Sequence, residues 1–188
     1  GSEMCIETVV ALYAIYNPAS QTAALLAVNA TAVVAPNVYA GANLPAGYTA
    51  SALVSVWPTN ASGQLIVACQ TDRSVAFAAT TLISTSSPIS SAPPVSMATY
   101  VPKNAKTVSG LIGVSSQNST SASTAVYSTS GLVGQQQTSV AVGSAVTTIG
   151  GSSFSKLAIV TPQTIYWNSL QVGGTFVSGN IVLNGYDF

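Results

Sequence analysis

Apolar and polar residues alternate in short segments along most of the chain, and residues typical of turns separate these segments. The clearest example is 48–57 (YTASALVSVW), in which Ala50, Ala52, Val54 and Val56 fall on one face. Alternation with a period of two is typical of a strand with one buried face. Similar patterns, bounded by Gly, Pro, Asn and Ser, predict further strands at 7–16, 22–29, 64–70, 75–77, 107–115, 123–127 and 135–142.

The C-terminal stretch predicts three more strands, at 157–160, 163–167 and 175–186, because its apolar runs are rich in β-branched and aromatic residues. The last of these ends close to two aromatic residues, so we expect it to be tied into a sheet. Gly, Ser and Pro dominate three other segments, and these are predicted to be loops: 84–96, 143–155 and 168–174.

Together these segments predict an all-β fold, specifically an antiparallel β-sandwich of the jelly-roll type. We expect a strand content above about 40%, against a usual value of roughly 20–25%, and no helix longer than about two turns. The spacing of turns favours two domains, an N-terminal β-meander at 1–62 and a β-sandwich at 63–188.

The composition restricts the possible functions. Only 4% of the residues are charged and the net charge is zero, yet 48% are hydrophobic, whereas about 25% are charged in ordinary globular chains. No apolar run approaches the roughly 18 residues of a spanning helix, which argues against membrane insertion. The absence of net charge also argues against nucleic acid as a partner. A weakly repelling surface favours contact between identical chains, and we expect a homotrimer.

Catalytic chemistry has little support in the sequence. There is no histidine for an ordinary catalytic triad. Asp72 and Asp187 are the one plausible carboxylate pair for a glycosidase, which needs two carboxylates about 5 to 10 Å apart, and a Ser–Lys dyad through Lys156 has no further support. No metal-binding spacing is present. We therefore expect a protein that is not an enzyme and that uses no metal or other cofactor.

The two cysteines, Cys5 and Cys69, allow a disulfide, and the sequence does not exclude one. The favoured interpretation is a pair of buried thiols in a protein made in a reducing cytosol.

Several short motifs resemble the C-terminal region of phage tail-fibre and tailspike proteins. They are YAIYNP (13–18), ALL (24–26), LPAGYT (44–49), SG (62–63), VPKNA (101–105), IVTPQTIY (159–166) and NGY (184–186). Members of that family usually carry more Arg and Asp between the Tyr-Thr and Ser-Gly turns, where this chain has Ala52 to Trp57. The resemblance implies a trimeric fibre tip in the virion, made in the host cytoplasm, that binds a host cell-surface receptor. Residues 1–62 would then lead out of the fibre or shaft, and 63–188 would form the tip.

Five residues are candidates for binding a receptor glycan: Tyr127, Asn118, Gln135, Trp57 and Trp167. An aromatic ring at a strand end offers a face to a sugar, while neighbouring amides bind its hydroxyl groups. Two polar loops, 116–121 and 128–137, flank Tyr127 and would hold this site. The competing interpretation is that the rings pack in the core or at a subunit interface, as most strand aromatics do.

Three functions are compatible with these features. The first is a tail-fibre or tailspike tip that binds a host glycan and is joined to the rest of the virion tail. The second is a capsid decoration or cement protein. The third is a trimerisation module at the fibre end, without a ligand of its own.

Overall fold

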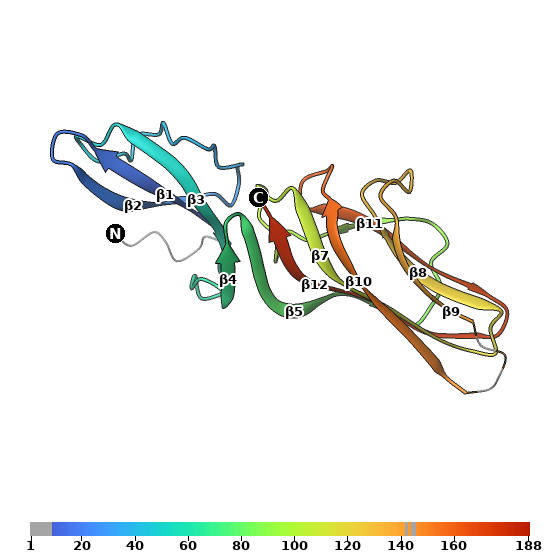
Figure 1. Ribbon diagram of the computed structural model, residues 1–188. Coiled ribbons are helices and arrows are strands. Elements are labelled where there is room, and N and C mark those ends of the chain that lie inside the picture. The colour runs from blue at the N-terminus through green and yellow to red at the C-terminus, as the bar shows by residue number, and fades with distance from the viewer. Residues whose placement is uncertain (1–8, 142, 144–145) are drawn as a thin grey trace. The chain divides into compact units, whose positions relative to one another are not determined.

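The computed structural model describes residues 9–141, 143 and 146–188, and these residues form an all-β protein (Figure 1). Strands account for 59% of the chain, the sheets are antiparallel, and the described residues include no helix. The predicted all-β class with antiparallel strands and the predicted strand content above about 40% are therefore confirmed, whereas the jelly-roll sandwich stays a prediction.

Twelve strands follow one another in the described part of the chain. They are β1 (Val9–Asn17), β2 (Thr22–Asn29), β3 (Ala50–Pro58), β4 (Ala68–Thr71), β5 (Ser74–Thr85), β6 (Pro94–Ser96), β7 (Thr107–Gln117), β8 (Ser121–Tyr127), β9 (Gln136–Val140), β10 (Thr148–Ala158), β11 (Thr164–Val172) and β12 (Thr175–Asp187).

The chain folds into two compact units. Unit 1 contains the described residues up to 67, together with 98–104 and 188, and unit 2 contains 68–97 and the described part of 105–187. Each unit is described by itself below. The division into domains at 62/63 stays a prediction.

Unit 1 is built on the sheet β2-β1-β3. Alternation along β1 turns Ala11, Tyr13 and Ile15 to one face, where each is at most 3% exposed. The segment 30–47 covers this face, and the Tyr13 hydroxyl donates to the Pro36 carbonyl at 2.9 Å. Asn104 also holds this segment, because its side-chain amide accepts a hydrogen bond from Ala35 N and donates one to Ala35 O.

Unit 2 contains a five-stranded sheet, β10-β7-β12-β5-β4, and a four-stranded sheet, β6-β11-β8-β9. Apolar side chains from both sheets meet in one cluster, with Val114 and Phe176 from the first sheet, and Ala122 and Val140 from the second. The strand predicted at 175–186 is confirmed as β12. It lies in the centre of the larger sheet, between β7 and β5.

Two segments that the sequence predicted as loops are strands. Within the predicted loop 143–155, residues from Thr148 onward belong to β10, which pairs with β7. The predicted turn 168–174 is shorter than expected, because β11 continues to Val172 in register with β8. Gly and Ser have little intrinsic preference for strands, and here pairing with a regular neighbour overrides that preference.

Smaller corrections concern edge strands. The strand predicted at 64–70 begins only at Ala68, as β4, and the predicted loop 84–96 contains the short strand β6. β6 begins with Pro94, which is tolerated at the edge of a sheet because it needs no partner for a backbone N–H. Cys69 is exposed instead of buried, since β4 is an edge strand of only four residues. The possible disulfide between Cys69 and Cys5 involves a residue that lies outside the described part of the chain.

Gly110 on β7 gives a direct test of the packing in unit 2. A Cβ atom at this position would lie 1.9 Å from the Val182 carbonyl oxygen and 2.7 Å from the Phe154 ring. We expect Gly110→Ala to lower the free energy of unfolding by about 3 kcal/mol or more, since backbone must move. Urea denaturation measures the change.

Gly151→Ala is the matched control, because its Cβ would meet only the Ile112 carbonyl oxygen, at 3.6 Å. It should change the stability by less than about 1 kcal/mol. Equal losses for the two variants would contradict the packing described here.

Candidate functional site

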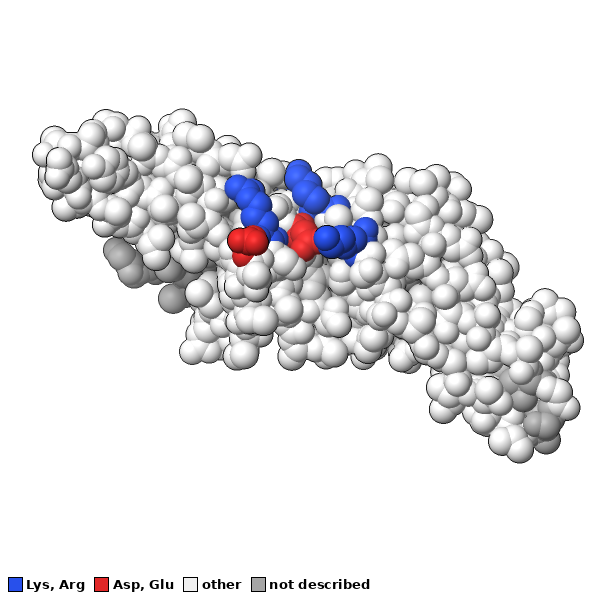
Figure 2. Space-filling view, in the orientation of Figure 1, with Lys and Arg blue, Asp and Glu red and all other residues white. Residues whose placement is uncertain are grey.

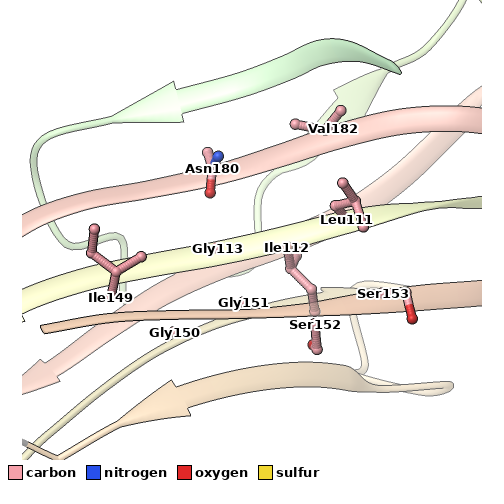
Figure 3. A pocket seen from close by; sticks show the side chains of 10 residues that line it. All are labelled: Leu111, Ile112, Gly113, Ile149, Gly150, Gly151, Ser152, Ser153, Asn180 and Val182. Atoms are coloured by element: carbon pink, nitrogen blue, oxygen red, sulfur yellow. The ribbon is translucent and has the colours of Figure 1, made fainter. Parts of the chain in front are cut away.

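A groove of about 560 Å³ lies on the outward face of the five-stranded sheet of unit 2 (Figure 3). It runs over β10, β7 and β12, the three strands that neighbour one another in this sheet. Ten residues line it: Leu111, Ile112, Gly113, Ile149, Gly150, Gly151, Ser152, Ser153, Asn180 and Val182.

The groove exists because glycines meet across two strands. The register of β10 and β7 pairs Gly151 with Gly113, so neither strand projects a side chain outward at this level. The residues before and after them on this face do project, and Leu111 is 45% exposed and Ile149 78% exposed. The result is a floor without side chains of its own between aliphatic walls (Figure 3).

Asn180 supplies an amide to the groove. It lies opposite Gly113 in the pairing of β12 with β7, and its side chain is exposed. A Cβ atom at Gly113 would lie 2.1 Å from Asn180 Oδ1, so the amide lies against the glycine backbone. Glycine at 113 therefore permits the position of the amide, which remains available to a ligand's hydroxyl groups.

The groove is uncharged. In unit 2 the charged residues lie toward the end of the five-stranded sheet where β12 ends and β5 and β7 begin. They are Asp72, Arg73, Lys106, Lys156 and Asp187. Figure 2 shows charged side chains gathered in one area of the visible face. Asp187 lies seven positions after Asn180 along β12, roughly 23 Å at about 3.3 Å per residue. Lys156 of β10 is nearer to the groove, three positions after the lining residue Ser153.

At the charged end, Asp187 is hydrogen-bonded to the two strands beside β12. The Thr107 hydroxyl donates to Asp187 Oδ2 at 2.6 Å. This hydrogen bond is the main reason why the pKa of Asp187 lies below its ordinary value; a hydrogen bond from Ser74 and the charge of Lys156 add to the effect, while burial opposes it. The carboxylate thus joins β12 to both of its neighbouring strands.

The predicted binding ring, Tyr127, is buried. It is 3% exposed, and its hydroxyl donates to Asn168 Oδ1 at 3.1 Å. Trp167 is 7% exposed in the same sheet. Both rings pack within unit 2, as the competing interpretation expected, and Tyr127 has no open face for a sugar in this chain.

The other three predicted residues lie apart. Asn118 is exposed in the turn before β8 and lines a small polar pocket of about 350 Å³. Gln135 lies at the opposite end of β8 and β9, where its side-chain amide donates to Gln137. Trp57 belongs to unit 1, where its indole N–H donates to Ile66 O at 2.9 Å. The five predicted residues do not form one site.

Sequence reasoning missed the groove residues. The alternation of Leu111, Gly113 and Ser115 on one face of β7 was a usable signal. The matching strand β10 gives no such signal, because the sequence predicts a loop at 143–155, and without that strand the pairing of Gly113 with Gly151 cannot be inferred.

No protein-family model matches this chain, and no curated protein matches it. The resemblance to phage tail-fibre and tailspike proteins stays a prediction. In the described part of the chain, no three or more His, Cys, Asp or Glu side chains are grouped so as to hold a metal ion. Within the same residues there is no helix with the length and hydropathy needed to span a membrane.

The lowered pKa of Asp187 predicts how stability depends on pH. Its contribution is fully present above the ordinary carboxyl pKa, about 3.9, and is lost as the pH falls through the lowered value in the folded protein. We expect Asp187→Asn to make the free energy of unfolding less dependent on pH between about 4 and 2, measured by urea denaturation.

Thr107→Val should have a similar effect, because it removes the main hydrogen-bond donor and keeps the shape of the side chain. A pH dependence identical to that of the wild type in both variants would contradict this role of Asp187.

Proposed function

We propose that this chain is the tip of a phage tail fibre or tailspike and that it binds a neutral glycan on the host cell surface as a homotrimer. In this proposal unit 2 is a jelly-roll-like β-sandwich, and the groove over Gly113 and Gly151 is its glycan site. The observation that carries the proposal is the groove itself, which is open, uncharged and combines aliphatic walls with an exposed amide.

The chemistry of a sugar ring matches these walls. Its C–H face packs against Leu111, Ile149 and Val182, and its hydroxyl groups exchange hydrogen bonds with the Asn180 amide. A site of this kind gives a dissociation constant in the millimolar range, or about 4 kcal/mol. Three copies on one fibre tip raise the avidity by orders of magnitude.

A second surface supports the homotrimer. In unit 1 the face of the sheet opposite its core is also apolar: Ala14 of β1 pairs with Leu25 and Ala52, and Leu12 pairs with Ala27. Leu25 is 70% exposed. An antiparallel sheet with one face in water normally carries polar residues there. In the proposed trimer, this apolar face of unit 1 packs against the other copies.

The apolar face of unit 1 also favours a second candidate function. A capsid decoration protein, or a trimerisation module at the fibre end, would need that face and no glycan site. The resemblance to tail-fibre motifs and the open groove favour the receptor-binding tip, with its virion location and its connection to the rest of the tail.

Filling the groove tests the glycan site. Gly151→Val places a branched side chain over the floor, where a Cβ atom meets only ordinary contacts. We expect the wild-type protein to bind neutral oligosaccharides on a glycan array. The apparent affinity of the variant should be at least about tenfold lower, because the valine side chain occupies part of the groove in which the sugar would lie.

Ala158→Val, on the exposed charged end of the same strand, is the matched control and should bind like the wild type. Binding by Gly151→Val at the wild-type level, with the fold intact by circular dichroism, would show that the groove is not the glycan site.

A charge on the apolar face of unit 1 tests the trimer. Leu25→Lys places an ammonium group where the proposed interface excludes water, and burying an unpaired charge is costly. We expect the wild-type protein to have the mass of a trimer by multi-angle light scattering, and the variant that of a monomer. Gln64→Lys, on an exposed turn of the same unit, should stay trimeric. A monomeric wild-type protein at micromolar concentration would refute the trimer.

A further inference from the structure

Unit 1 contains an apolar cavity of about 300 Å³ between the covered face of its sheet and the segment 30–47. The sheet contributes Ala11, Tyr13 and Val28, and the covering segment contributes Val33, Ala35 and Tyr39. Neither the groove nor the proposed trimer surface includes this cavity. Its volume lies at the lower end of the range for small-molecule sites, about 300–1,000 Å³.

The segment over the cavity is fixed to the sheet at several points. Leu53 N donates to Asn37 O at 2.8 Å, and Tyr39 N donates to Ser51 Oγ at 2.8 Å. Ala35 is held by both ends of the Asn104 amide. Because these hydrogen bonds hold the walls, the cavity is formed before any ligand enters, and binding does not have to order the segment.

Two tyrosine rings shape the interior. The ring centroids of Tyr13 and Tyr39 lie 5.3 Å apart, and the angle between the two ring planes is 49°. The Tyr39 ring lies directly over Gly41, where a Cβ atom would meet its hydroxyl oxygen at 2.4 Å and its Cζ at 2.5 Å. The glycine therefore allows the ring to lie close to the backbone at 41, and both residues line the cavity.

The surroundings of the cavity select against charged ligands. The described residues 9–67, which supply all of its lining, contain no charged side chain. The described cation of unit 1, Lys103, donates to Ala32 O at 2.7 Å and is not part of the lining. A charged ligand would lose its hydration without gaining a partner inside the cavity.

We propose that this cavity binds a neutral ligand with a single aromatic ring or a hydrocarbon group of similar size. The aliphatic walls remove the ring from water, and Tyr39 offers an aromatic edge or face to it. This site is independent of the proposed glycan groove, which lies in the other unit and selects hydroxyl groups.

Methyl NMR on the full chain tests the proposal, with toluene and p-cresol as neutral probes and benzoate as their charged counterpart. We expect saturable shifts of the Val28 and Val33 methyl groups with the neutral probes, and binding of benzoate at least about tenfold weaker. Absence of saturable shifts with both neutral probes would overturn the proposal. Equal shifts at Val114 in unit 2 would do the same, since they would indicate unspecific binding.

Two variants locate the site. Ala11→Leu adds three carbons to the cavity floor and should reduce the affinity for toluene at least about tenfold. Where Ala11→Leu fails to fold, Gly41→Ala serves instead. Its added methyl group displaces the Tyr39 ring, which forms one wall of the cavity. Gly131→Ala is its control, since a Cβ there meets only Thr129 Oγ1, at 3.6 Å. Wild-type affinity in a folded Gly41→Ala protein would show that the ligand does not use this wall.

Discussion

The pairing of β12 with both of its neighbours is the constraint on which unit 2 depends. β7 and β5 flank it along most of its length, and its inward side chains Ile181 and Leu183 are fully buried. The register of this pairing decides what faces outward. Sliding β12 by one residue would turn Asn180 into the core and Ile181 into the groove. Burial of the isoleucine therefore fixes the position of the amide.

The distribution of charge follows the same strands. The carboxylate of Asp187 lies at the end of β12 and accepts from Thr107 of β7, so this ionised group stabilises the sheet at the end where the other charged residues of unit 2 lie. Around the groove, the sheet's outward face carries hydroxyl groups, the Asn180 amide and aliphatic side chains. The glycan proposed for this face would be recognised by shape and by hydrogen bonds, since the residues that line the groove carry no charge.

The sequence predicts the fold class well because alternation is a local signal. β3 and β12 carry it clearly, and both strands were found close to their true bounds. For β10 the sequence predicts a loop up to 155 and a strand only from 157, because Gly and Ser are frequent in its first half and its strand conformation depends on β7, about forty residues away in the chain. The candidate site failed for a related reason. Tyr127 lies at a strand end, as predicted, but sequence cannot show that Asn168 of β11 closes over its hydroxyl.

The missed strand and the missed groove have one physical origin. A groove on a sheet forms where side chains are absent, so the residues that create it are those with the least chemistry to read. Gly151 and Gly113 do this in unit 2, and in unit 1 Gly41, which lies outside the strands, leaves room for the Tyr39 ring that lines the cavity. In a chain this poor in charge, the space left by small residues distinguishes one part of the surface from another. Sites for neutral ligands are then found from the register of the strands and from close contacts at glycine, and not from reactive side chains.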